Sequence, residues 1–387
     1  MKQTKFLILY LLFSSIFRSI GINIFGANFY ITFFLGLIFL IKSDFKINSK
    51  LLYFFLFAVP ALFYSYLDNN LITLIYGSYE VITIFVIFFS IDQLKLNKLD
   101  INKVKFVVII ILLFYLIFGL VQALAPAEIS LLITKILSNS DTSNFNYVES
   151  NILAGNSRIS LNFGVSTTAS GFIFVLMFFY YLLSQIKKNK YDNLILLIGF
   201  LIIIFTGTRH SIVVALILLL IVGLNKKQNI LKLLIPLFLA ILILTKIGYD
   251  SIVLERFSRG FDDNFNARFD TGLSNFSDFI FQDWTNFFFG NGPGKLYQLG
   301  AADWTDSGFV SNGLLLFHLN FGVLIYLFLW KSIKPIYHNT KSLILFICLF
   351  LILISDNYSY FTHSVLFLLI LNFKFLNLSY KNEYSTN

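Results

Sequence analysis

The chain has 387 residues, of which 57% are hydrophobic and 13% are charged, and its formal net charge is +9. Water-soluble globular proteins carry about a quarter of charged residues, so this composition excludes that class and indicates an integral membrane protein. Basic residues in such a protein either orient it in the membrane or bind an acidic partner. Their placement along the chain distinguishes these two roles.

Apolar runs recur along the whole chain. A helix needs about 20 residues to cross the hydrocarbon core, and somewhat fewer where flanking polar residues thin the bilayer. The sequence therefore predicts an all-α, polytopic bundle of about twelve transmembrane helices in a single domain, residues 1–387. The predicted helices span residues 5–22, 28–41, 51–67, 71–91, 104–124, 168–186, 192–206, 210–224, 229–245, 308–330, 342–355 and 361–376.

The two ends of this helix series have features of their own. Lys2 and Lys5 precede the first apolar run, and no small-residue cleavage site follows it, so we expect the first helix to remain as an anchor. Ser355, Asp356 and Asn357 separate the last two runs, which are short. A re-entrant hairpin is an alternative to two full spans there.

Lysine placement orients the predicted helices, because basic residues are retained in short cytoplasmic loops. With the N-terminus inside, twenty lysines fall in cytoplasmic segments and only Lys135, Lys246 and Lys295 lie outside. This asymmetry predicts that both termini are cytoplasmic. It also explains the net positive charge without a nucleic-acid partner.

Two segments on the predicted outer side, 125–167 and 246–307, are far longer than the usual connection of about 4–6 residues. Long loops of this kind usually carry function. In the second segment, apolar residues at helical spacing between Phe257 and Ile280 predict amphipathic helices that lie on the outer membrane surface. The fold expected is thus a helix bundle with a large outer loop.

The arginines follow the opposite trend to the lysines, since all six fall on the outer side or in the outer part of a membrane helix. They are Arg18, Arg158, Arg209, Arg256, Arg259 and Arg268. A guanidinium group is a planar fork of donors suited to phosphate or carboxylate, and it stays charged in poorly hydrated sites. The set predicts a site for a phosphate-bearing ligand at the outer surface. Each arginine taken alone can instead extend toward water or pair with a nearby acid, and for Arg18 this second interpretation is favoured.

Other chemistries are disfavoured by residue type and spacing. The histidines lack the spacing of metal ligands, so no metal is expected; they are His210, His318, His338 and His363. Cys348 is alone, which excludes a disulfide within the chain, and Gly290-x-Gly292 does not continue as a nucleotide-binding loop. No cofactor is predicted. Glu80 and Gln122 lie in or near spans, where they either line a polar cavity or make hydrogen bonds within the bundle.

Several motifs together resemble a known family. A Thr-Gly-Thr-Arg turn ends at Arg209, and an outer loop with arginines is followed by Phe-Gly-Asn-Gly at 289–292 and an Asp-Trp pair. Asp306-Ser307-Gly308-Phe309 then opens a span that ends near Asn320-Phe321-Gly322. This arrangement resembles the O-antigen polymerase (Wzy) and O-antigen ligase superfamily of bacterial envelope proteins over roughly residues 150–330, and the topology agrees over the rest.

The resemblance implies a GT-C-type, metal-independent glycosyltransferase of the bacterial inner membrane with a periplasmic large loop. A polymerase of this family moves a growing glycan from undecaprenyl diphosphate to a hydroxyl of the next lipid-linked repeat unit. Fixed cations would stabilise the leaving diphosphate, and a carboxylate or imidazole would accept the hydroxyl proton. The partners implied are the undecaprenyl-diphosphate-linked glycan, membrane lipids and a chain-length-regulating membrane protein.

Each role implied by the family is assigned to particular residues of this chain. Arg209, Asp306 and His210 are expected to act in catalysis, Arg209 on the diphosphate and the other two as candidate bases. The residues expected to bind the substrate are Arg158, Arg256, Arg259 and Arg268.

Two alternatives remain. Ligases resemble one another in an outer His-Asn pair followed by nine residues and a glycine, but here the spacing that ends at Gly322 begins with Ser311-Asn312, which favours the polymerase. A lipid-linked oligosaccharide flippase or other transporter also has about twelve spans. Such folds usually show internal repeats and short loops, and the 246–307 segment does not fit them.

Overall fold

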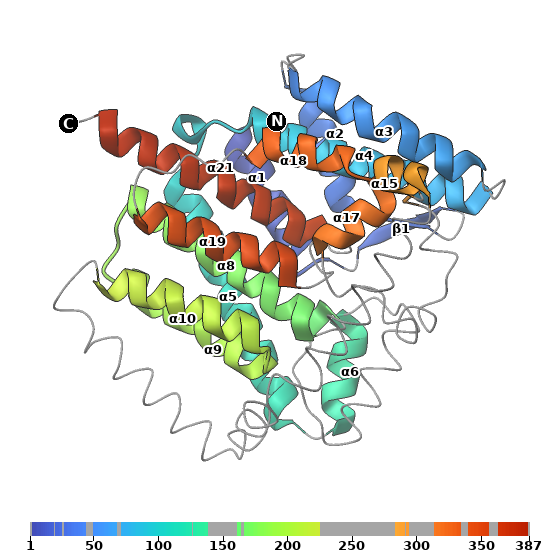
Figure 1. Ribbon diagram of the computed structural model, residues 1–387. Helices are drawn as coiled ribbons and strands as arrows, with labels where there is room; N and C mark the ends of the chain where they lie inside the picture. Colours follow the sequence, from blue (N-terminus) through green and yellow to red (C-terminus); the bar gives the residue numbers. More distant parts are fainter. Residues whose placement is uncertain are drawn as a thin grey trace.

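The computed structural model is almost entirely helical in the part of the chain that it describes (Figure 1). The described residues are 2–18, 20–24, 27–43, 49–67, 71–125, 127–137, 161–163, 166–224, 283–290, 292–293, 313–333, 340–355 and 363–385. Each predicted helix in these ranges coincides with helical residues, although those predicted at 5–22 and 308–330 differ in extent; the helix predicted at 229–245 lies outside the described residues.

The described helices have the following bounds. They are α1 (Gln3–Ser14), α2 (Ile31–Ile41), α3 (Ser49–Leu67), α4 (Leu71–Gln93), α5 (Ile101–Leu124), α6 (Ala127–Leu137), α8 (Ser166–Ile186), α9 (Asp192–Thr206), α10 (Arg209–Leu224), α15 (Trp284–Phe289), α17 (Gly313–Phe321), α18 (Leu324–Ile333), α19 (Thr340–Ser355) and α21 (His363–Ser385). Two single turns of 3-10 helix, η1 (Leu96–Lys98) and η2 (Leu161–Phe163), complete the helical part.

The first helix is shorter than the predicted 5–22. It ends at Ser14, and the chain continues through a turn into an antiparallel hairpin of β1 (Gly21–Ile24) and β2 (Ala27–Tyr30). The hydroxyls of Ser14 and Ser15 donate to the carbonyl of Leu11, and such local hydrogen bonds compete with helix continuation. An apolar run alone did not distinguish a helix from a helix followed by a hairpin.

Among the described residues, three helices are long and apolar enough to cross a membrane: Leu74–Gln93, Ile101–Gln122 and Thr168–Ile186. Eight further apolar helices are shorter, at 10–17 residues. On α5, Phe106, Ile110, Leu113 and Ile117 are exposed at helical spacing and form an apolar stripe. A stripe of this kind is incompatible with water, and together with the three long helices it marks the chain as a membrane protein.

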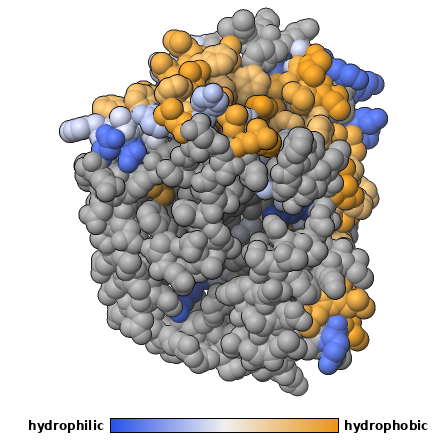
Figure 2. All heavy atoms as spheres, turned by 90° about the vertical axis from the view of Figure 1, so that its right-hand side faces the viewer, coloured by the Kyte–Doolittle hydropathy of each residue, from blue (hydrophilic) through white to orange (hydrophobic). Residues whose placement is uncertain are grey.

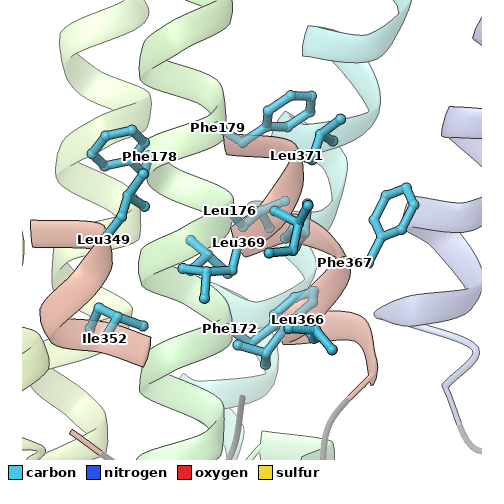
Figure 3. Packing of buried hydrophobic residues seen from close by; sticks show 14 of the residues in the cluster. Phe172, Leu176, Phe178, Phe179, Leu349, Ile352, Leu366, Phe367, Leu369 and Leu371 are labelled. Carbon is cyan, nitrogen blue, oxygen red and sulfur yellow. The ribbon is translucent and has the colours of Figure 1, made fainter. Parts of the chain in front are cut away.

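The centre of the bundle is formed by α8 and α21, which pack along each other. Phe172, Leu176 and Phe179 of α8 interdigitate with Leu366 and Leu369 of α21, with α19 alongside (Figure 3). Because α8 is buried on nearly all sides, its surroundings are protein rather than lipid. The other helices are arranged around this pair.

One end of the bundle, here named the lysine end, is where basic residues meet the ends of neighbouring helices. The ammonium group of Lys105 on α5 lies 2.6 Å from Asp192 at the start of α9, and it also donates to the carbonyl of Lys187 at 2.8 Å. Tyr180 donates to the same carboxylate at 2.7 Å. This buried network joins the start of α5, the end of α8 and the start of α9.

A second set of contacts joins α3, α4 and α21 at the same end. Lys50 forms an ion pair with Asp92 at 2.7 Å. Lys374 donates to the carbonyls of Ile91, Asp92 and Leu94, at and just beyond the end of α4. The cation also complements the negative end of the α4 dipole.

The start of α5 belongs to the lysine end as well. Asp100 precedes the helix, and its carboxylate accepts a hydrogen bond from the backbone N–H of Lys103. This hydrogen bond holds the pKa of Asp100 below its usual value, because it stabilises the ionised form. The backbone N–H of Asp100 in turn donates to the hydroxyl of Thr4, which ties α1 to the same level.

The helix predicted at 308–330 is divided into α17 and α18 at Gly322, which has a φ of +65°. A side chain at Gly322 would collide with the backbone of Phe288 and Phe289, and one at Gly290 would lie 2.6 Å from backbone atoms of Asn320 and Phe321. Two hydrogen bonds close this contact, from Val323 N–H to the Phe287 carbonyl and from Gly292 N–H to the Asn320 carbonyl. We call this contact the glycine junction.

The buried Lys105–Asp192 pair yields a first prediction. Replacing Lys105 with Met leaves the Asp192 carboxylate without its cation in a buried site, which is expected to lower the free energy of unfolding by about 3–5 kcal/mol. Adding Asp192→Asn should restore most of the loss. Unfolding of the purified protein in mixed micelles with increasing SDS measures both.

Lys103→Met is the matched control, because the Lys103–Asp100 pair is largely exposed and its loss should change stability little. Equal losses in Lys103→Met and Lys105→Met would contradict a special role for the buried pair.

The glycine junction yields a second prediction. Gly207 and Gly322 have similar positive φ values of +62° and +65°, but a side chain at Gly207 meets open space. Gly207→Ala should therefore cost only the left-handed backbone strain of about 1–2 kcal/mol. Gly322→Ala should cost roughly 1–3 kcal/mol more, since it also forces the junction apart. SDS unfolding of both variants tests this, and equal losses would show that the close contact is unimportant.

Candidate functional site at the distal end

The end of the bundle opposite the lysine end is here named the distal end. It contains the ends of α1, α3, α5 and α9 and the starts of α8, α10 and α21. Figure 2 views the molecule from this side: the described residues along its upper and right edges are mostly hydrophobic, and hydrophilic ones are visible deeper in the face.

Of the predicted site residues, Arg209 and His210 lie within the described part, at the first two positions of α10. Both are half-buried. Arg158, Arg256, Arg259, Arg268 and Asp306 lie outside the described residues, as do the amphipathic helices predicted between 257 and 280. The structure therefore places two of the seven predicted residues at the distal end and leaves the others as predictions.

The turn before Arg209 is formed by small polar residues. Gly207 adopts the left-handed conformation that ends α9, and the Thr208 carbonyl accepts the first hydrogen bond of α10, from Ile212. Thr206 and Ser211 are fully buried. The hydroxyl of Ser211 donates to that of Ser170 on α8 at 3.0 Å, so the start of α10 is fixed to the start of α8.

This turn places two kinds of anion-binding group together. The first backbone N–H groups of a helix have no helical partners and attract anions, and Arg209 adds a guanidinium at the same position. Buried hydroxyls also allow helices to approach closely, so packing alone explains part of the arrangement.

Arg18 lies at the same end of the bundle, after the last turn of α1. Its guanidinium is stacked over the ring of Phe163 with 4.5 Å from Cζ to the ring centroid. Phe163 in turn packs against Tyr115 and Phe172. The sequence favoured water or a nearby acid as the partner of Arg18, and the described contact is with an aromatic ring, whose face attracts a cation.

Gln122 makes hydrogen bonds within the bundle, one of the two alternatives expected for it. Its side-chain amide exchanges two hydrogen bonds with the backbone of Leu161, at 3.0 and 3.3 Å. Leu161 has a φ of +51°, a conformation that costs a residue with a side chain about 1–2 kcal/mol, and the amide clamp offsets this strain. The clamp positions the turn that carries Phe163 beneath Arg18.

Glu80 and His363 form a pair that the sequence did not predict. Their side chains lie 3.4 Å apart, between Oε2 of Glu80 on α4 and Nε2 of His363 at the start of α21, and they are separated by 283 positions in the chain. Both residues are buried, at 2% and 8% exposure. The spacing of histidines along the sequence could not reveal this pair, although an acidic residue within a span was a partial signal.

The motifs that carry the family resemblance pack against each other in the glycine junction. Phe-Gly-Asn-Gly at 289–292 belongs to the second outer segment, and Asn320-Phe321-Gly322 ends α17. The rings of Phe287 and His318 lie with their centroids 5.5 Å apart beside this contact. Two sequence motifs about 30 residues apart thus form one structural unit at the distal end.

Trp284 and Phe288 of α15 are stacked and exposed next to the junction. Such aromatic side chains are frequent at the level of lipid headgroups.

In the part of the chain that the structure describes, no three His, Cys, Asp or Glu side chains come together as a metal site would require. Comparison of the chain with models of protein families, with curated proteins and with solved structures finds no match in any of the three.

Proposed function

We propose that the chain is a membrane glycosyltransferase of the O-antigen polymerase type. In this proposal it joins undecaprenyl-diphosphate-linked repeat units into a surface polysaccharide at the outer face of the bacterial inner membrane. The observation that carries the proposal is the separation of cations: Lys50, Lys105 and Lys374 join helix ends at the lysine end, whereas Arg18 and Arg209 are at the distal end.

The arrangement of helix ends supports a bundle of about twelve spans. The helices α3, α4, α5, α8 and α9 alternate in direction, since the start of α3 meets the end of α4 and the starts of α5 and α9 meet the end of α8 at the lysine end. After Leu224 the chain leaves α10 at the lysine end, and by Asp283 it is at the distal end, beside α3, where Phe289 stacks on Tyr64. A further crossing between these two points, as predicted at 229–245, agrees with both positions.

The charge pattern supports an orientation with the lysine end in the cytoplasm, since lysines are retained on that side. The distal end would then face the periplasm, where lipid-linked repeat units are joined. In this orientation a lipid-borne diphosphate at the bilayer surface would lie at the level of Arg209 and the start of α10.

The chemistry proposed for Arg209 follows from its charge. When the glycosidic bond to the diphosphate breaks, negative charge develops on the leaving oxygen, and a fixed cation stabilises the transition state more than the ground state. A guanidinium can also hold two phosphate oxygens at once.

Replacement of Arg209 tests the function. Arg209→Ala in the native host should abolish long-chain polysaccharide while the protein remains in the membrane at its normal level, and Arg209→Lys should restore little, because an ammonium lacks the planar fork. Lys188→Ala, an exposed change at the lysine end, is the control and should leave chain lengths unchanged. Gel analysis of surface glycan measures the result. Normal chain lengths in Arg209→Ala would remove this residue from the site.

The same gel distinguishes the alternatives when the whole gene is deleted. A single repeat unit retained on the lipid A core indicates a polymerase, because units still reach the outer face and are still ligated. Complete loss of capped core indicates a ligase or a flippase instead.

The proposed orientation has its own test. Cys348 is the lone cysteine, so a Cys348→Ser background allows single cysteines to be placed at Trp284 and at Lys188, which are both exposed. A membrane-impermeant thiol reagent should label Trp284→Cys once the outer membrane is opened, and Lys188→Cys only after the inner membrane is disrupted. The reverse pattern would exclude a periplasmic distal end.

A further inference from the structure

The Glu80–His363 pair is held where two helices run side by side. Both α4 and α21 run from the distal end to the lysine end, where Lys374 contacts the carbonyl of Ile91. Glu80 and His363 each lie eleven residues before that contact, which is about 16 Å of helix. The pair is therefore well inside the bundle, about half the thickness of a hydrocarbon core from the lysine end of α4.

Stability does not account for this pair. Removing two ionisable groups from water costs several kcal/mol each, and apolar replacements of similar size are often as stable or more so. The same two helices are already joined by Lys374, and α21 packs its apolar face on α8. Ionisable residues retained inside a membrane bundle usually serve proton or ligand chemistry.

The geometry of the pair fits a proton acceptor. With a proton on Nε2, the imidazole donates to Oε2 of Glu80, and this fixes the ring and leaves Nδ1 on its opposite side as a base. The carboxylate would stabilise the imidazolium that forms when Nδ1 takes up a proton, as carboxylates do beside catalytic histidines. The titratable groups that face His363 from the described residues of α4 are Glu80 and Tyr79, whose ring lies edge-on to the imidazole at 5.5 Å.

We propose that Glu80 and His363 form the base of the glycosyl transfer, an inference that rests on the proposed function. The oxygen of the acceptor hydroxyl forms a bond to the anomeric carbon of the donor sugar, and the bond from that carbon to the diphosphate oxygen breaks. The bonding electron pair leaves with undecaprenyl diphosphate, and the hydroxyl proton passes to Nδ1 of His363. Glu80 is the positioning residue and His363 the catalytic one, in place of Asp306 or His210.

The test is polymerisation of purified lipid-linked repeat units by the full-length protein in nanodiscs, measured as a rate against pH. His363→Gln should lower the rate by about 10²–10⁴-fold, as expected for loss of a general base, while binding of the lipid-linked unit is retained. Glu80→Gln should lower kcat less and leave KM unchanged, because the imidazole keeps a hydrogen-bond acceptor but loses the carboxylate that stabilises its protonated form in the transition state. Asp92→Asn, which breaks an ion pair at the lysine end, is the control and should leave the profile unchanged.

Two further measurements separate chemistry from folding. Added imidazole should partly restore the rate of His363→Ala, which a purely structural role would not allow. The double variant Glu80→Gln/His363→Gln removes both charges at nearly constant shape, so it should unfold like the wild type and still be inactive.

Each failure has a distinct meaning. A wild-type rate in His363→Gln, or in the double variant, would overturn the assigned base while the proposed function stands. If the unaltered protein joins no lipid-linked repeat units but the same membranes do so with a known polymerase added, the proposed function fails, and this inference fails with it.

Discussion

The arrangement of this bundle depends on the pairing of buried charges at its lysine end. An ammonium or carboxylate beside lipid is tolerated only when it is paired or hydrogen-bonded, so each of these groups fixes the helices that carry its partners. Lys105 meets Asp192, and Lys374 meets the carbonyls at the end of α4. These contacts fix the positions of α4, α5, α9 and α21 along the bundle axis. They therefore also determine which residues of these helices lie at the distal end.

The distal end is held by different forces. Among its described contacts are a hydroxyl pair between Ser170 and Ser211, an amide clamp on Leu161, and the backbone contact of the glycine junction. The Glu80–His363 pair at the start of α21 is a further one, and the guanidinium of Arg18 is set against an aromatic ring. The contacts at the lysine end thus centre on ammonium groups, whereas the described contacts at the distal end involve hydroxyl, amide, imidazole and backbone groups.

The sequence was a good guide to helix positions and a poor guide to long-range pairs. Apolar runs gave α3, α4, α5, α8, α9 and α10 to within three residues at each end, since a membrane helix is determined by its own length and hydrophobicity. They missed α6, which lies in the segment 125–167 that the sequence assigned to an outer loop, and they extended α2 over residues of β2. The single helix predicted at 5–22 was wrong, because the residues of the helix and of the following strand are equally apolar. The run at 308–330 did not reveal the break at Gly322, because that break depends on a contact with Phe288, which is distant in sequence. Glu80 and His363, 283 positions apart, could be paired only once α21 was placed beside α4. Arg209 could be predicted from the sequence because its departure from the lysine pattern is a local property, and its role stays a prediction.

The Glu80–His363 pair lies well inside the bundle, and a polymerase and a transporter would need different access to such a pair. A transporter needs an ionisable group that is exposed alternately to the two sides, and such a group lies between two halves that move against each other. Here α4 and α21 are joined at the lysine end by three hydrogen bonds from one ammonium group, and α21 is packed into the core through Asn372, which donates to the carbonyl of Val175. If α4 and α21 separated to expose the Glu80–His363 pair to the lysine end, all of these hydrogen bonds would break together. His363 is the first residue of α21, and the hydrogen bonds of Lys374 and Asn372 do not hold the helix on its distal side. Access from the distal side alone would suit the proposed enzyme, whose lipid-linked substrate would approach from the outer membrane face.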